Sequence, residues 1–234
     1  MMNPKIQTNI QHLAVIMDGN RRWEQENVRK QYDGYIYGAQ VLKELIENVV
    51  DIEIPYLTVY AFSSENWQRP IKDVAALMNI GIDWLNNNKD FLMEKGIRCR
   101  IIGNRELLPA DVLMTIEEIE RCTENNANLN FQIALSYGAR DEIVRACIKF
   151  SKFIKDAISS SEITFEKFLD TKDIPDPDLL IRTGGQKRLS NYMLWQMAYT
   201  ELCFLDVLWP DFSNQHLINA INEYGQTERR FGCV

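Results

Sequence analysis

Short apolar runs alternate with longer amphipathic segments along most of the chain. Five short runs predict buried strands, over residues 12–17, 56–62, 97–102, 130–136 and 179–182. Five longer segments place apolar residues at helical spacing and predict helices, over residues 35–50, 73–94, 109–125, 139–159 and 213–230. This alternation predicts the α/β class, with a central, mostly parallel sheet and helices on both faces.

The chain is predicted to form a single domain. Its 234 residues contain no repeat and no linker rich in Pro, Gly or Ser, and a domain of this length can bury a core without disulfides or metals. We expect residues 1–11 to form a polar tail and residues 12–232 to form the folded domain. The tail lacks the apolar stretch of a signal peptide, and no apolar run approaches the ~18 residues that cross a bilayer.

Composition narrows the class of protein. Lys plus Arg number 26 and Asp plus Glu number 33, so the net charge of −7 argues against a nucleic-acid partner, which would need an excess of cations. The five cysteines are widely spaced without a Cys-x-x-Cys pair, and there are only two histidines. We therefore expect reduced thiols in a cytoplasmic protein rather than a disulfide framework or a zinc site.

Polar clusters follow the first, second and fifth predicted strands. Parallel strands joined by right-handed crossovers end along one edge of the sheet, where open α/β folds bind ligands. Asp18 beside Arg21 and Arg22 suits a magnesium-bound phosphate, although Asp18 alone also fits a helix N-cap. Arg182 and Arg188 flank two glycines, which suits an anion as well as a solvated turn. No P-loop, dinucleotide glycine motif, Gly-x-Ser-x-Gly elbow or Asp-Asp-x-x-Asp element occurs.

Four motifs follow one another along the chain. They are HLAVIMDGNRRW (12–23), YAFSSENW (60–67), IRTGG (181–185), and Glu201 followed by WPDF (209–212). With these motifs the chain resembles a cis-prenyltransferase of the undecaprenyl diphosphate synthase family over residues 12–232. The resemblance implies a parallel sheet surrounded by helices, an apolar tunnel, a homodimer and a Mg²⁺ cofactor. The implied reaction adds isopentenyl diphosphate repeatedly to an allylic diphosphate such as farnesyl diphosphate, and each new double bond is cis.

The resemblance also implies roles for individual residues. Asp18 would hold magnesium on a diphosphate, Glu201 would be the second metal carboxylate, and Asn66 would accept the proton lost after condensation. The loop around the allylic diphosphate would comprise Gly19, Asn20, Arg21, Arg22 and Trp23, and the flexible substrate segment would comprise Ser63, Ser64, Glu65, Trp67 and Arg69. The isopentenyl diphosphate site would comprise Arg182, Arg188, Leu189 and Ser190. Arg230 and Gly232 would reach the site of the partner subunit.

A growing hydrocarbon chain needs an apolar tunnel. The candidates for its wall, each of which alone also fits ordinary core packing, are Ala39, Leu42, Leu45, Ala61, Met78, Ile80, Leu85 and Leu129. The small side chains of Ala39 and Ala61 leave room for a long product, so we expect the C55 undecaprenyl diphosphate that serves as a cell-wall lipid carrier. Because this product belongs in a membrane, we also expect peripheral contact with the inner face of the membrane.

Three positions depart from the family pattern. Tyr35 stands in place of the usual histidine, Gln31 in place of a phosphate-binding arginine, and Gln186 in place of an acidic residue. These changes leave open a second hypothesis, a catalytically weak accessory or binding subunit of the same fold. Retention of Asp18 argues against it, because a non-catalytic relative has no need of a magnesium aspartate. A phosphohydrolase using Asp18 would lack a partner nucleophile.

Overall fold

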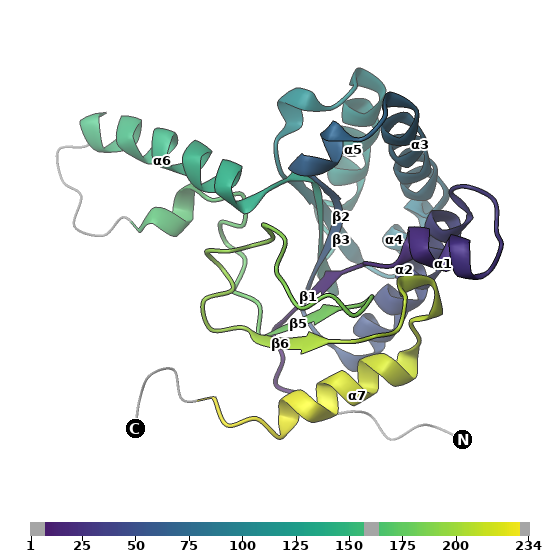
Figure 1. Cartoon of the computed structure of the whole chain (residues 1–234). Helices are drawn as coiled ribbons and strands as arrows, with labels where there is room; N and C mark the ends of the chain where they lie inside the picture. The colour runs from purple at the N-terminus through teal and green to yellow at the C-terminus, as the bar shows by residue number, and fades with distance from the viewer. Residues whose placement is uncertain (1–7, 157–163, 230–234) are drawn as a thin grey trace.

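The centre of the molecule is a six-stranded parallel sheet (Figure 1), seen in a computed structural model that describes residues 8–156 and 164–229. Within these residues the strand order is β3-β4-β2-β1-β5-β6, and every pair of neighbours is parallel. The strands are β1 (His12–Ile16), β2 (Tyr56–Ser63), β3 (Ile97–Ile102), β4 (Leu129–Tyr137), β5 (Leu179–Arg182) and β6 (Glu201–Phe204). The predicted α/β class with a parallel sheet is confirmed.

Helices connect the strands. The α-helices are α1 (Asn20–Glu26), α2 (Asp33–Ile52), α3 (Ile71–Asn87), α4 (Lys89–Glu94), α5 (Ala110–Thr123), α6 (Ala139–Asp156) and α7 (Asn214–Gly225). Short 3-10 turns are η1 (Ser64–Gln68), η2 (Arg105–Leu107), η3 (Phe165–Phe168) and η4 (Trp209–Asp211). Each predicted strand and each predicted helical segment is therefore present. The bounds of β3 and β5 match the prediction, and the ends of the other predicted elements are shifted.

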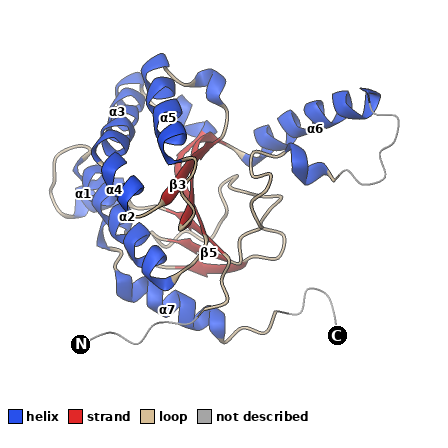
Figure 2. Cartoon of the chain, turned by 180° about the vertical axis from the view of Figure 1, so that it is seen from behind, coloured by secondary structure: helices blue, strands red, loops and turns tan. Residues whose placement is uncertain are grey.

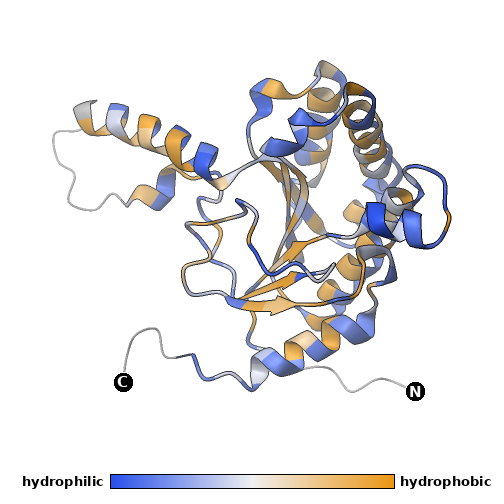
Figure 3. Cartoon of the chain, in the orientation of Figure 1, coloured by the Kyte–Doolittle hydropathy of each residue, from blue (hydrophilic) through white to orange (hydrophobic). Residues whose placement is uncertain are grey.

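The two faces of the sheet are covered differently. Along β1, Leu13 and Val15 pack in the larger core, whereas Ala14 and Ile16 pack in a second cluster, as alternation along a strand requires. The strands form the hydrophobic centre of the molecule (Figure 3). Figure 2 shows most helices gathered on one side of the sheet and long loops on the other. The second face packs against buried side chains of residues 192–197, while most of α6 projects away from the sheet (Figure 1).

Three features of the secondary structure differ from the sequence prediction. The segment 73–94 forms two helices, because Asn88 leaves helical geometry (φ −111°, ψ 10°) and its side chain donates to the Trp84 carbonyl at 2.8 Å. The polar helix α1 is unpredicted, since it buries only Trp23 and Glu24. The edge strand β6 is also unpredicted, because it has four residues and remains partly exposed.

The packed domain begins before residue 12. Ile10 is 1 % exposed within the core, and the Gln11 main-chain N–H donates to Asp178 Oδ2 at 2.7 Å. Residues 1–7 of the predicted tail, the end of the predicted 139–159 helix, and the C-terminal Arg230 and Gly232 lie outside the described residues. The four cysteines of the described part carry free thiols, as predicted. Among the helices described, none is both long and apolar enough to cross a bilayer.

Candidate active site

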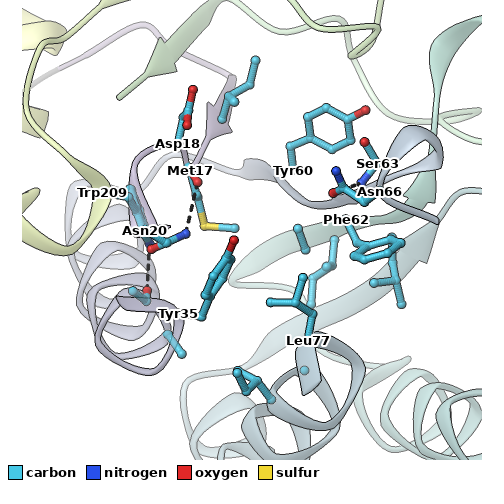
Figure 4. Close-up of a pocket in the computed structure, with 18 of the residues that line it drawn as sticks. Met17, Asp18, Asn20, Tyr35, Tyr60, Phe62, Ser63, Asn66, Leu77 and Trp209 are labelled. Atoms are coloured by element: carbon cyan, nitrogen blue, oxygen red, sulfur yellow. Dashed lines mark hydrogen bonds between the residues drawn. The ribbon is translucent and has the colours of Figure 1, made fainter. Parts of the chain in front are cut away.

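A cavity of about 820 Å³ opens beside the carboxyl ends of β1, β2 and β5 and extends between the sheet and helices α2 and α3 (Figure 4). Its polar lining includes Asp18, Gly19, Asn20, Arg21, Arg22, Ser63, Glu65, Asn66, Arg69, Arg182, Arg188, Ser190 and Asn191. Its apolar lining includes Ala39, Leu42, Ala61, Leu77, Met78, Ile80, Leu85, Ile133 and Leu135. The three polar loops therefore converge as predicted. A cationic end joined to an apolar body suits a ligand with an anionic head and a hydrocarbon chain.

Asp18 lies between two arginines at the polar end of the cavity. Its Oδ2 accepts a hydrogen bond from Arg182 Nη2 at 2.9 Å, and its Oδ1 accepts one from Arg22 Nη2 at 3.3 Å. The N-cap of α1 is Gly19, so the alternative of Asp18 as a helix cap is wrong. The Asp18 side chain is 30 % exposed, which leaves its carboxylate accessible to a ligand.

Arg182 is a buried cation held by the loop that follows it. Its side chain is only 4 % exposed. Nη1 donates to Ser190 Oγ at 2.7 Å and to the Arg188 carbonyl, while Nη2 donates to Asp18. Within the described residues its buried Nε has no hydrogen-bond partner. A buried guanidinium is stable only when it is paired, so Asp18 and Ser190 hold in place the cation predicted to bind a diphosphate.

Two glycines bring the backbone close to these cations. Gly184 and Gly185 have φ of 81° and 70°, a left-handed conformation that favours glycine. Arg22 Nη1 donates to the Gly184 carbonyl at 2.7 Å, and a Cβ at Gly184 would lie 2.3 Å from Arg22 Nη2. Glycine is therefore required where the loop after β5 meets the arginine of α1.

The η1 turn carries another part of the polar lining. The Ser63 main-chain N–H donates to Asn66 Oδ1 at 3.0 Å, and the Ser63 side chain caps the same turn. Glu65 Oε1 accepts a hydrogen bond from Asn191 Nδ2 at 2.8 Å. Burial opposes ionisation of Glu65, but hydrogen bonds from Asn191 and from its own turn outweigh it and lower its pKa. The turn is thus tied to the loop that carries the predicted isopentenyl site.

Sequence reasoning missed Tyr60 and Asn191, which both line the cavity. The Tyr60 ring stacks on Tyr192, with centroids 4.4 Å apart, and its hydroxyl donates to the Tyr137 carbonyl at 3.0 Å. Burial raises the pKa of Tyr60 well above its ordinary value. The only signals in the sequence were the place of Tyr60 within the 60–67 motif and the place of Asn191 directly after Ser190.

Five predicted site residues do not line the cavity, namely Trp23, Ser64, Trp67, Leu189 and Glu201. Trp23 Nε1 donates to Asp211 Oδ1 at 2.8 Å, and Trp67 Nε1 donates to Ser136 Oγ at 2.9 Å. Leu189 packs against the core of the second sheet face. These tryptophans and this leucine position the loops around the cavity rather than face its interior.

The carboxylate predicted to complete the metal site lies elsewhere in the chain. Glu201 opens β6 and pairs with Leu179, whereas Phe204 pairs with Arg182 near Asp18. Three residues of strand, about 10 Å, therefore separate Glu201 from the edge that carries Asp18. Within one chain the two carboxylates do not surround one ion, because Asp18 follows the carboxyl end of β1 whereas Glu201 lies at the amino end of β6.

The residues present still fit a magnesium ion. Among the described residues, no group of three or more His, Cys, Asp or Glu side chains could hold a metal by itself. Magnesium, however, needs only one or two protein carboxylates when phosphate oxygens and water complete its shell. The partly exposed Asp18 carboxylate, beside arginines that attract phosphate, meets that requirement.

Most of the predicted apolar wall lines the cavity. Ala39, Leu42, Ala61, Met78, Ile80 and Leu85 face it. The predictions for Leu45 and Leu129 are wrong, because these side chains are 2 % and 0 % exposed within the close-packed core. Leu129 is the first residue of β4 and therefore lies at the amino end of the sheet, away from the cavity.

The three departures from the family pattern have different surroundings. Tyr35 lines the cavity, and its hydroxyl accepts a hydrogen bond from Arg69 Nη1 at 3.2 Å. Gln31 lies outside the cavity lining, and its amide donates to Asp73 Oδ1 at 3.2 Å. Gln186 accepts a 2.6 Å hydrogen bond from the cavity arginine two residues further on. Of the three, Tyr35 is placed to touch a ligand.

Comparison with known proteins agrees with this site. The Prenyltransf family model, that of undecaprenyl diphosphate synthase, matches residues 16–232. The isoprenyl transferase of Aquifex aeolicus is 41 % identical over 224 residues, which cover 96 % of each chain. The crystal structure of lavandulyl diphosphate synthase from Lavandula x intermedia, in complex with dimethylallyl diphosphate, superposes with a TM-score of 0.91 at 33 % identity, covering 95 % of this chain and 98 % of that one. A probable undecaprenyl diphosphate synthase from Campylobacter jejuni gives a TM-score of 0.79 at 32 % identity, covering 99 % and 100 % of the two chains.

Family model, relatives and fold agree over nearly the whole chain. In this chain the fold places a cationic end and an apolar body in one cavity. The chain therefore belongs to the undecaprenyl diphosphate synthase family and is a transferase of the cis-prenyltransferase type.

Proposed function

We propose that the protein adds isopentenyl diphosphate repeatedly to an allylic diphosphate, such as farnesyl diphosphate, and forms a cis double bond at each step. The expected product is a long polyprenyl diphosphate, C55 undecaprenyl diphosphate. The observation that carries the proposal is one cavity in which a cationic end is continuous with an apolar body. The solved relative that binds dimethylallyl diphosphate supports an allylic ligand on this fold.

The cationic end would receive the allylic diphosphate. Arg21 and Arg22 line it from α1 in a chain whose net charge is −7. Preorganised cations stabilise the negative charge that grows on the diphosphate as it leaves. Asp18 would hold a magnesium ion, which when bound neutralises part of that charge.

The isopentenyl diphosphate would bind beside it, at Arg182, Arg188 and Ser190. An alkene is a weak nucleophile, so holding it in line with the allylic carbon contributes much of the rate. We place Asn66 as the group that receives the departing proton. Its Oδ1 already accepts from the Ser63 N–H, and an amide oxygen has a second lone pair for another donor.

The apolar body of the cavity would house the growing chain. Ala39 and Leu42 line it from α2, Met78 and Leu85 line it from α3, and Ala61 lines it from β2. Burying each added C5 unit against these side chains stabilises the elongated intermediate through the hydrophobic effect. Each addition would therefore also strengthen the binding of the growing chain to the protein.

The exposed apolar surface supports a homodimer. Helix α6 projects from the body (Figure 1), and Val144 and Ile148 on it are 58 % and 51 % exposed. Trp195, on the loop that covers the second sheet face, is 40 % exposed. Large exposed apolar patches mark protein interfaces, so a second copy of the chain is the proposed partner of this surface.

We also propose peripheral contact with the cytoplasmic face of the membrane for product release. Val28, between α1 and α2, is 92 % exposed, and Ile71, the first residue of α3, is 87 % exposed. Tyr32 and Asp73 join these two segments by a 2.7 Å hydrogen bond. These two exposed apolar side chains, on segments joined by that hydrogen bond, would contact lipid and allow a hydrocarbon product to pass into it.

The test is incorporation of radiolabelled isopentenyl diphosphate with farnesyl diphosphate and magnesium, with and without a chelator, followed by separation of products by length. We expect magnesium-dependent long products. Absence of incorporation by the folded protein with every allylic primer tried would contradict the proposal and favour the accessory-subunit alternative.

A further inference from the structure

Tyr35 lines the cavity where its polar end meets its apolar body (Figure 4). It lies in the first turn of α2, and Figure 4 shows its hydroxyl pointing toward the side that carries Asp18. Arg69 is the C-cap residue of η1, and its Nη1 donates to the Tyr35 hydroxyl at 3.2 Å. Both residues line the cavity.

We propose that Tyr35 is a positioning residue that holds the Arg69 guanidinium in the cavity lining, where that guanidinium receives the allylic diphosphate. This role rests on the proposed prenyl transfer and names an additional contributor to it. Tyr35, although it lacks the charge that a histidine can carry, therefore contributes to the site.

The chemistry of the pair supports this role. The phenolic oxygen of Tyr35 accepts a hydrogen bond from one N–H group of the Arg69 guanidinium. The other guanidinium N–H groups remain available as charged donors to an anion.

The η1 turn is hydrogen-bonded on both sides, to Asn191 and to Tyr35. On one side, Glu65 ties the turn to Asn191 at 2.8 Å, in the loop of the proposed isopentenyl site. On the other side, Arg69 ties it to Tyr35 on α2. The turn therefore bridges the two proposed diphosphate sites, and loss of the Tyr35 hydroxyl would release only the allylic side.

Preorganisation explains the expected effect. Arg69 is a long, exposed side chain, and such a side chain loses rotamer freedom when it binds a ligand. Tyr35 restricts the guanidinium before the ligand arrives, which lowers that cost. The effect should appear in binding of the allylic substrate rather than in the chemical step.

The experiment compares steady-state kinetics of the full-length protein and its variants Tyr35→Phe, Arg69→Met and the double variant, with thermal unfolding to confirm that each is folded. We expect Tyr35→Phe to raise the KM for farnesyl diphosphate about three- to tenfold, with kcat and the KM for isopentenyl diphosphate unchanged. The double variant should be no worse than Arg69→Met alone, because Tyr35 acts through Arg69.

Two further variants make the test specific. Tyr35→His should keep a near wild-type KM, since an imidazole nitrogen can accept from Arg69. Tyr37→Phe is the matched control, because the Tyr37 ring packs on Trp23 with centroids 5.0 Å apart, outside the cavity lining. It should change nothing.

An unchanged KM in Tyr35→Phe, or effects of Tyr35→Phe and Arg69→Met that simply add, would overturn the role of Tyr35 while leaving prenyl transfer intact. If the folded wild-type protein incorporates no isopentenyl diphosphate, the proposed function itself is wrong, and the role of Tyr35 is wrong with it.

Discussion

The stability of this protein should fall in mild acid because of one buried histidine. His12 opens β1 and is 0 % exposed. Its Nδ1 lies 2.6 Å from the Pro175 carbonyl oxygen, and its Nε2 lies 2.7 Å from Thr58 Oγ1. Burial lowers the pKa of His12 to about 4, although the Pro175 carbonyl and the charge of Asp178 oppose the shift.

The size of the effect follows from this pKa. The unfolded chain binds a proton at His12 below pH 6.5 or so, whereas the folded protein resists it until pH about 4. The unfolded state therefore binds more protons in this window, and the free energy of unfolding decreases as the pH falls through it. Between pH 7.5 and pH 5.0 the loss from His12 alone is about 2 kcal/mol.

The assay is urea unfolding, followed by tryptophan fluorescence at a fixed protein concentration and at several pH values from 7.5 to 5.0. His12→Gln removes the titration, so the wild-type protein should lose about 2 kcal/mol more than this variant over the range. His216→Gln is the control, because His216 lies in the exposed capping box of α7 and should leave the difference intact. An identical pH dependence in the wild-type protein and His12→Gln would refute the reasoning.

Three further predictions concern the site. Asp18→Ala should lower turnover at least a hundredfold while the protein stays folded, and retention of near wild-type incorporation would exclude the proposed magnesium role. Asn66→Asp keeps an oxygen for the Ser63 N–H, so incorporation and Tm should both survive, whereas Asn66→Ala should lose about 1 kcal/mol of stability together with most activity. If Asn66→Asp is as inactive as Asn66→Ala, the amide N–H₂ rather than the oxygen is required. Ala61→Trp should shorten the product by at least one C5 unit by filling the cavity, and an unchanged product ladder on chromatography would remove Ala61 from the tunnel wall.

The fold was predictable where burial dominates. The strand His12–Ile16 is buried at every position, so its apolar run was unambiguous. The strand Glu201–Phe204 has one neighbour and partly exposed side chains, so the same signal was too weak. The break at Asn88 depends on a single side-chain hydrogen bond, which hydrophobic periodicity does not register.

The location of the site was predictable from the sequence, but the residues that line it were less so. Parallel topology alone brings the loops after β1, β2 and β5 together. Trp23 and Asp18 share one motif, yet Trp23 turns away to bond Asp211, and residue type does not reveal that direction. Glu201 is assigned to the metal site by resemblance alone, and within one chain the strand register sets it at the opposite edge of the sheet from Asp18.

Asp18 forms ion pairs with two arginines at the polar end of the cavity. Arg182 is 4 % exposed and Arg22 is 40 % exposed, and both pair with the Asp18 carboxylate. A buried guanidinium left without an anion would cost several kcal/mol, so Asp18 holds these cations in place. In the proposed reaction the diphosphate oxygens would take over the arginines, and the Asp18 carboxylate would turn to the metal. The same aspartate would thus stabilise the free protein and help assemble the reactive complex, so Asp18→Ala should lower the free energy of unfolding as well as the turnover.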